Sequence, residues 1–475
     1  MQDGDERLAA ELFATGARRH SSDSSMWMNT AVAQAALLAG GQVTPDETLE
    51  LYCEARAAAL LARRAGSDAA IELLQSIESE LAGLAQQARN AENNTEAGPL
   101  CPYDNLLPGL RRVANIRSAA GDNLEQYLQA VRTGCDEESL VVELTGHRKK
   151  QSIGSTAGDI SASNLLAISS LLDSCGVVAV VGIHDPAAID RAREAQLEHF
   201  SRINLTQLEQ SGARKTVNSR RSSEFHDMAV RGDPRRIEAT LPLDPTFSEI
   251  NAAPAVLSMV EYIMQDRDLE IDTHSYVHAE PGSPQQHWHR DVDFLHGEAA
   301  IAATTGSRAS PQHTPPHGMV AVVPLVDLET NNGATEFIVG SHVHPAVLGQ
   351  GLDLWDGEAG TAHWEGMPHL TRMKVLVPCG SVLLFDLRTT HRGGPNESEL
   401  PRSVLYTSYV REWFRDAVNF KPPQSVWWDG LRSERLQKLF ARVDGRDYTL
   451  KLEKLLAQKG IDVKTELLQQ RGESQ

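Results

Sequence analysis

The chain has few cysteines, no excess of basic residues and no long apolar run. Its five cysteines are widely spaced and include no CxxC pair: Cys53, Cys101, Cys135, Cys175 and Cys379. An odd number of scattered cysteines favours neither a disulfide framework nor a zinc knuckle. We therefore expect reduced thiols and a reducing compartment, the cytoplasm.

The charge balance and the hydropathy pattern exclude further partners. The chain carries 64 Asp and Glu against 45 Lys and Arg, a formal net charge of -19. Such a surface repels phosphate backbones and anionic lipids, so neither nucleic acid nor a membrane is expected as a partner. No stretch approaches the ~18 apolar residues that span a bilayer. The first twenty residues lack the basic start and apolar run of a secretion signal.

The 475 residues are enough for more than one domain. We expect a helical region over residues 1–150, a mainly β catalytic core over 151–420 and a helical extension over 421–475. The first boundary falls in GHRKKQSIGSTAGDISASN, residues 146–164, which is rich in Gly, Ser and charge.

Cap signals predict the helices of the first region. TPDE at residues 44–47 offers an N-cap hydroxyl, a proline at the first helical position and a glutamate three residues after the cap. Further helices are expected from Ser67-Asp68 and over residues 122–132, the latter closed by Gly134. No fixed period links them, so a repeat array is not favoured. Residues 1–150 are therefore a packing buttress or a surface for a protein partner.

The central region has short β-branched segments separated by Gly, Pro and Asn. A helix over LLAISSLLDS leads into a buried strand, GVVAVV at residues 176–181, and another helix opens at Asp185-Pro186. From about Ile271 the strand-like runs are MVAVVPLVDL, ATEFIV, MKVLV, SVLLFDL and SVLYTSYV. Such a series predicts a sandwich or barrel. Helices return in SERLQKLFARV and YTLKLEKLLAQKG.

The segment QQHWHRDVDFLH, residues 285–296, places three histidines and two aspartates in twelve residues. Residues two apart on a strand share a face, so His289 and Asp291 can reach one metal ion. His391, at the end of SVLLFDLRTTH, is the expected third ligand. Two imidazoles and one carboxylate form the facial set of non-haem Fe(II) oxygenases, which leaves positions open for co-substrate and dioxygen.

Arg402 is the candidate anchor for a co-substrate. It opens the strand-like run that follows His391, with ten residues between the two. The planar guanidinium pairs with carboxylates more specifically than a lysine does. A dicarboxylate can therefore bind iron at one end and Arg402 at the other.

Three stretches resemble the phytanoyl-CoA dioxygenase family of 2-oxoglutarate-dependent oxygenases, including its ectoine hydroxylase branch. They are WHRD (288–291), VVPLVDLETNNGATEFIVGSH (322–342) and GSVLLFDLRTTHRGGPNESELPRSVLYTSY (380–409), and the resemblance covers roughly residues 160–420. It implies a double-stranded β-helix (jelly roll), Fe(II) held by His289, Asp291 and His391, and 2-oxoglutarate held by Arg402. The implied reaction uses dioxygen to hydroxylate a small organic molecule and releases succinate and CO2.

Two alternatives remain open. His287, His289 and His391 form a cupin-like triad without a carboxylate, but that triad leaves Arg402 unexplained. A non-catalytic barrel that binds a ligand or partner is the other alternative. Within the oxygenase interpretation, Asp291 disfavours halogenation, because halogenating relatives lack this carboxylate. The substrate stays open, and loops 297–318 and 351–369 are expected to cover its pocket.

Several other polar or aromatic residues are expected to be structural. Trp288 is expected in the core, His342 in a loop hydrogen bond and Gly333 at positive φ. His274 and Tyr276 either line the co-substrate site or pack structurally. Asp293 and His296 are expected to face solvent or substrate.

Overall fold

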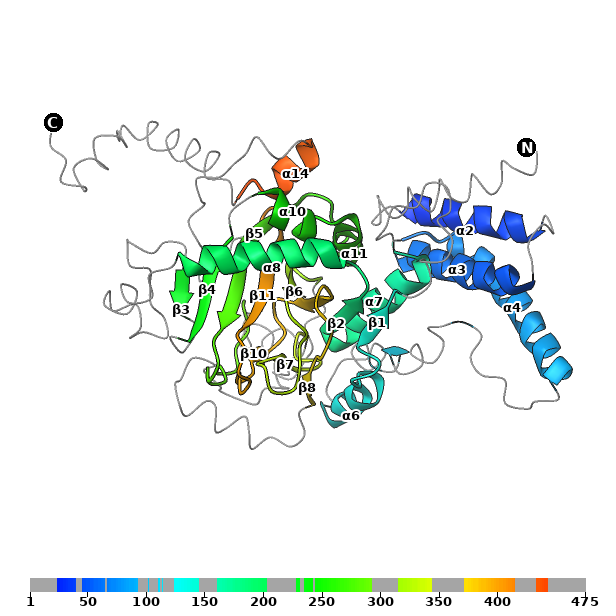
Figure 1. The fold of residues 1–475 in the computed structure, drawn as a ribbon. Helices are drawn as coiled ribbons and strands as arrows, with labels where there is room; N and C mark the ends of the chain where they lie inside the picture. The colour runs from blue at the N-terminus through cyan, green and yellow to red at the C-terminus, as the bar shows by residue number, and fades with distance from the viewer. Residues whose placement is uncertain are drawn as a thin grey trace, which may run out of the picture.

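The computed structural model of the protein places a helical region beside a β-rich core (Figure 1). The structure describes residues 24–39, 45–64, 66–92, 101, 110–111, 113, 124–144, 160–202, 228–230, 235–241, 244–292, 315–343, 371–414 and 433–442. The helices before the core are α2 (Ser24–Ala39), α3 (Pro45–Arg64), α4 (Ala70–Glu92) and α6 (Leu124–Gly134). The helix starts predicted near residues 44 and 67 are confirmed within a few residues.

Helices α2 and α3 dock on two helices of the core, α7 (Ala162–Cys175) and α11 (Pro254–Met264). The buried face of α3 is rich in alanine, which lets helices approach closely. Trp27 of α2 meets Tyr262 of α11 edge to face at 6.2 Å. Glu54 of α3 accepts a hydrogen bond from the Ala162 backbone N–H, at 2.8 Å, at the start of α7. One continuous hydrophobic core therefore runs through both regions.

The main sheet has eight strands in the order β1-β2-β9-β6-β11-β5-β4-β3, antiparallel except for the β1–β2 pair. β1 precedes residue 150, so the helical region also contributes one edge strand. The strands are β1 (Val141–Glu143), β2 (Val177–Val181), β3 (Met228–Val230), β4 (Arg236–Thr240), β5 (Leu269–Ala279), β6 (Gly318–Pro324), β9 (Val382–Asp386) and β11 (Arg402–Arg411). The prediction of a mainly β core is confirmed at this level.

A smaller sheet, β10-β7-β8, packs against one face of the main sheet. Its strands are β7 (Thr335–Ile338), β8 (Arg372–Lys374) and β10 (His391–Gly393). Phe337 of β7 contacts Phe385 of β9 with ring centroids 5.2 Å apart. We call the main-sheet face that carries Phe385 the inner face.

Helices cover the opposite, outer face (Figure 1). They include α8 (Pro186–Ser201) and α10 (Pro245–Asn251), and both begin at an aspartate that caps the first backbone N–H groups. His199 of α8 hydrogen-bonds the Tyr276 hydroxyl at 3.1 Å. Asn251 of α10 bonds the His274 ring at 3.0 Å. Alternate residues of β5 therefore pack under the helices.

The expectation of reduced cysteines is wrong for four of the five. Cys53 pairs with Cys101, and Cys135 pairs with Cys175, with Cα atoms 5.5 and 5.8 Å apart. Cys379 alone is free. The partners are 48 and 40 residues apart in sequence, and spacing of that kind does not identify a pair before the helices are packed.

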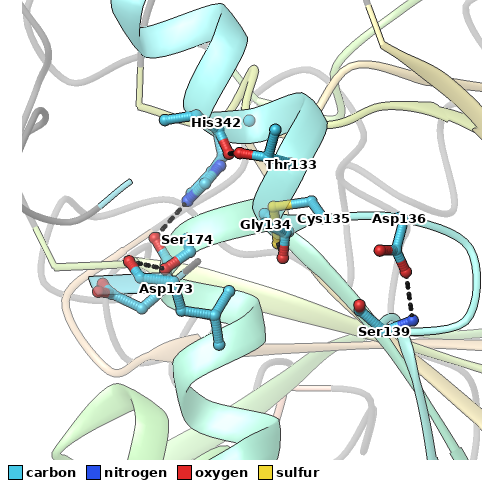
Figure 2. The surroundings of a disulfide bond; sticks show 12 residues. Thr133, Gly134, Cys135, Asp136, Ser139, Asp173, Ser174 and His342 are labelled. Atoms are coloured by element: carbon cyan, nitrogen blue, oxygen red, sulfur yellow. Dashed lines mark hydrogen bonds between the residues drawn. A yellow bond between two sulfur atoms is a disulfide. The ribbon is translucent and has the colours of Figure 1, made fainter. Parts of the chain in front are cut away.

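The Cys135–Cys175 disulfide ties the end of α6 to the end of α7 (Figure 2). Gly176, which follows, adopts φ 81°, and a Cβ there would lie 2.5 Å from the His342 ring. His342 in turn bonds the Asp173 carbonyl at 3.1 Å. The predicted structural role of His342 fits this contact, and the tight packing explains why a glycine follows Cys175.

Within the described residues, no helix is both long and apolar enough to cross a membrane. At the C-terminal end, α14 (Glu434–Leu439) matches the first predicted helix. The second, YTLKLEKLLAQKG, lies outside the described residues, as do most of the two predicted pocket loops, Asp293 and His296.

Candidate metal centre

Two of the candidate ligands, His289 and His391, pair through their backbones. The backbones of His289 and His391 exchange two hydrogen bonds, at 3.0 and 2.8 Å. Gln286 bonds Gly393 in the same way, at 2.9 Å through the backbone and 2.8 Å through its side chain. The segment before the HxD motif therefore runs antiparallel to β10, and this pairing brings the two histidines together although 102 residues separate their numbers.

The HxD segment is not the strand that we predicted. His289 forms an isolated bridge, and Asp291 lies in a bend after it. The backbone N–H groups of Asp291 and Val292 both donate to the Leu387 carbonyl, at 3.2 and 3.3 Å. This turn, rather than strand alternation, directs Asp291 toward His391, with 3.9 Å between its Oδ1 and the His391 Nε2.

Each histidine is oriented through its Nδ1 atom. Nδ1 of His289 lies 3.0 Å from the His287 carbonyl, and Nδ1 of His391 lies 3.0 Å from the Thr389 carbonyl. A carbonyl only accepts, so Nδ1 carries the proton in both rings. In the neutral form of each ring, Nε2 is then the atom with the free electron pair, and this is the form that binds a metal.

His289, Asp291 and His391 each offer one ligand atom, and these atoms all lie within 4.8 Å of one another. Among the described residues this is the one group of that kind, and His287 is not part of it. The donor set of two neutral imidazoles and one carboxylate suits a divalent transition metal such as Fe(II). The geometry therefore favours the HxD set over the cupin-like triad.

A buried ion pair braces the turn before His391. Arg388 donates to both carboxylate oxygens of Asp386, at 2.9 and 2.7 Å, and both residues are buried. Burial by itself would raise the pKa of Asp386, but the charge and hydrogen bonds of Arg388 outweigh it and lower that pKa. Thr389 adds a 2.9 Å bond to the Gly176 carbonyl. These contacts fix the chain just before the ligand.

Arg402 lies on the inner face at the start of β11. It is 2% exposed and donates to the Gly333 carbonyl, at a turn where Gly333 adopts φ 85° as predicted. Burial, and then the positive charge of Arg236, lower the pKa of Arg402 to about 9. None of the ion pairs within the described residues includes Arg402. A carboxylate beside Arg402 would stabilise the positive charge of its guanidinium.

The strand register places Arg236 close to Arg402. Both residues pair with Ala279, from β4 on one side and β11 on the other, so the three share a row on the inner face. Arg236 donates to the Gly394 carbonyl at 2.6 Å, and its Nη1 atom would overlap a Cβ placed at Gly393. A larger residue at position 393 would therefore displace the Arg236 guanidinium. No sequence pattern points to Arg236, because β4 is short and isolated in the chain.

Other candidates proved structural. His274 and Tyr276 point to the outer face, so they do not line this row. Trp288 is buried, as predicted, with the Arg392 guanidinium 4.4 Å above its ring. Tyr406 was missed by the sequence reasoning, although its hydroxyl donates to Asp291 Oδ2 at 2.5 Å. Its position four residues after Arg402, on the same strand face, was the available signal.

Comparison with known proteins finds a family match in the core. Residues 172–404 match the family model of phytanoyl-CoA dioxygenase (PhyH). This part of the chain is similar to that family, as the three motifs predicted. Dioxygenase trt7 of Aspergillus terreus is 31% identical over 130 residues, which are 27% of this chain and 37% of the relative. The match thus spans little more than a third of that curated relative.

Solved structures give more distant matches. The α-ketoglutarate-dependent epimerase SnoN from nogalamycin biosynthesis is 18% identical, with 52% of this chain and 80% of that chain covered and a TM-score of 0.33. HygX from Streptomyces hygroscopicus, with nickel, 2-oxoglutarate and hygromycin B bound, is 17% identical, with 52% and 86% covered and a TM-score of 0.35. Superpositions at this level define neither fold nor activity.

Proposed function

We propose that this protein is an Fe(II)- and 2-oxoglutarate-dependent dioxygenase that hydroxylates a small organic molecule. The observation that carries the proposal is the convergence of His289, Asp291 and His391, with ligand atoms within 4.8 Å of one another. The match of residues 172–404 to the phytanoyl-CoA dioxygenase family model supports the same reaction class. We infer that the two sheets form the double-stranded β-helix that the resemblance implies.

The chain's own residues divide the binding work. Nε2 of His289, Nε2 of His391 and Oδ1 of Asp291 would hold the metal. Arg402 would bind the distal carboxylate of 2-oxoglutarate, since a buried guanidinium without an acidic partner among the described residues gains most from an anion. When bound, Fe(II) supplies the dioxygen chemistry that couples release of succinate and CO2 to substrate oxidation.

Hydroxylation is favoured because Asp291 would fill the ligand position that a halide needs in the halogenating enzymes. The substrate is a small molecule whose identity the described residues do not specify. The remaining assignments are proposals of the same kind: a helical region over 1–150 that offers a surface for a protein partner, a catalytic core over 151–420 and a C-terminal extension over 421–475. The cytoplasmic location is also a proposal, and the two disulfides do not favour it.

The direct test follows 2-oxoglutarate itself. Purified protein loaded with Fe(II) under nitrogen, then exposed to air, should convert 2-oxoglutarate to succinate slowly without substrate and faster with a suitable one. Asp291→Ala is the matched control for iron chemistry outside the site. No succinate above that control, across a broad metabolite panel, would refute the proposal. A metal-free protein that still binds a partner through residues 1–150 would support the non-catalytic alternative.

A further inference from the structure

Tyr406 holds one oxygen of the candidate ligand Asp291. We propose that Tyr406 is a positioning residue that fixes this carboxylate so that Oδ1 alone faces the metal. The inference rests on the metal site of the proposed function, but not on its reaction.

The strand register determines where Tyr406 lies. It is opposite Ser275 of β5 and Val322 of β6, in the middle of the three central strands. Its ring lies 6.3 Å from that of Phe385, and the Phe385 ring lies 4.7 Å from that of His391. Tyr406 therefore belongs to the inner face, next to the metal ligands, and its hydroxyl is carried by a strand paired on both sides.

The two oxygens of Asp291 have different neighbours. Oδ2 accepts a hydrogen bond from the Tyr406 hydroxyl at 2.5 Å, whereas Oδ1 lies 3.9 Å from the His391 Nε2. A carboxylate without such a bond can rotate and bind a metal through both oxygens. A hydrogen bond to one oxygen stabilises the single-oxygen mode and keeps another coordination position free. Partners of this kind orient the ligands and commonly affect metal affinity.

The side chain of Asp291 needs this help more than that of either histidine. Both histidines pair with each other through the backbone, and each ring is oriented by a carbonyl at 3.0 Å. Asp291 follows the bridge in a bend, where its N–H donates to Leu387 at 3.2 Å. The side-chain orientation is thus set by contacts beyond the backbone, and the Tyr406 hydroxyl supplies one of them.

Tyr409 provides a matched control three residues further along β11. Its hydroxyl also donates to an oxygen, the Asn251 carbonyl, but on the outer face under α10. Tyr406→Phe and Tyr409→Phe each remove one hydroxyl and one hydrogen bond from the same strand. A general loss of stability would affect both variants, whereas a change in metal binding would be confined to Tyr406→Phe.

The test measures Co(II) binding to metal-free protein in the absence of 2-oxoglutarate. Co(II) is titrated against a chelator of known affinity, and the visible spectrum of the Co(II) form reports its coordination number. We expect Tyr406→Phe to bind Co(II) about 10- to 100-fold more weakly than the unaltered protein, with a changed spectrum. Tyr409→Phe should bind within about twofold and keep the spectrum, although it melts at a lower temperature.

Three results would overturn the inference: Co(II) affinity and spectrum unchanged in Tyr406→Phe, equal weakening in both variants, or no Co(II) binding by the unaltered protein. A failure of the proposed function looks different. In that case the unaltered protein binds Co(II) and Tyr406→Phe weakens the binding, but the Fe(II) form consumes no 2-oxoglutarate.

Discussion

The candidate metal centre and the contact between the helical region and the core are held together by different forces. At the metal centre, a few residues are fixed by short polar contacts, such as the paired backbones of His289 and His391. Between α2–α3 and α7–α11, apolar burial dominates, and Trp27 is 1% exposed there. Burial depends on area and shape, whereas polar orientation depends on single atoms. Substitutions at the candidate metal centre should alter metal binding with little effect on stability. Substitutions in the contact between the helices should lower stability with little effect on metal binding.

Asp291→Ala should have the largest effect, confined to binding. It removes the only charged residue among the three candidate ligands, so we expect Fe(II) affinity to fall by about 100-fold or more, beyond the range typical of outer contacts. Succinate formation should be lost with it. Iron titration measures the loss of binding, and the melting temperature of the metal-free protein measures any loss of stability. Asp190→Ala, an exposed carboxylate on α8, is the control. A large fall in the melting temperature of metal-free Asp291→Ala would contradict the expectation that this substitution affects binding and not stability.

Trp27→Ala should have the opposite profile. A buried aromatic truncated to alanine costs roughly 3–5 kcal/mol of unfolding free energy, measured by denaturant titration. Val32→Ala on the same helix is the control, because Val32 is 48% exposed and should change stability by about 0.5 kcal/mol or less. Co(II) affinity of the folded variant should match that of the unaltered protein. Lost metal binding in folded Trp27→Ala would show that the helices shape the site.

Arg402→Ala sharpens the comparison within the site. Truncating one partner of a buried charge pair costs on the order of 2–5 kcal/mol, so the apparent affinity for 2-oxoglutarate should fall by roughly thirty-fold or more. Metal affinity should stay unchanged, because Arg402 is not among the three ligands. Saturation curves for 2-oxoglutarate measure this loss of affinity. Arg402→Lys should lose less affinity than Arg402→Ala, because it keeps the charge. An unchanged curve would remove the assignment of Arg402.

Glu54→Gln should have the smallest effect, visible in the pH dependence of stability. Burial raises the pKa of Glu54, although hydrogen bonds from Ser163, Ala162 and Ser161 oppose this rise. The folded state then binds the proton more tightly than the unfolded state does. The resulting stabilisation is complete below the unfolded pKa of 4.5 and is lost as pH rises through the folded pKa. Unfolding titrations at several pH values should show that Glu54→Gln lacks this pH-dependent part of the unfolding free energy. The same slope of unfolding free energy against pH in Glu54→Gln and the unaltered protein would contradict the prediction.

The sequence predicted most of what depends on local pattern. The cap at Asp185, the start of α3 near residue 45, the β-branched runs of the core and the motifs around His289 and His391 all follow from nearby residues. Contacts between distant segments were not accessible in the same way. The disulfide partners, the β4 residue Arg236 and the bond from Tyr406 to Asp291 each depend on tertiary packing. The HxD pair came together by a turn against Leu387 and not by the strand that we expected.

Strand β11 carries Arg402 and Tyr406 on one face, four residues apart and paired on both sides for most of its length. At roughly 3.3 Å per residue, the two side chains start about 13 Å apart. Sliding the strand by one residue would turn both to the outer face, and sliding it by two would move the anchor about 7 Å, far more than one methylene. On the proposed assignment, the choice of co-substrate chain length is thus fixed in discrete steps by the register. A shift of register therefore cannot adapt the site to a dicarboxylate one carbon longer than 2-oxoglutarate.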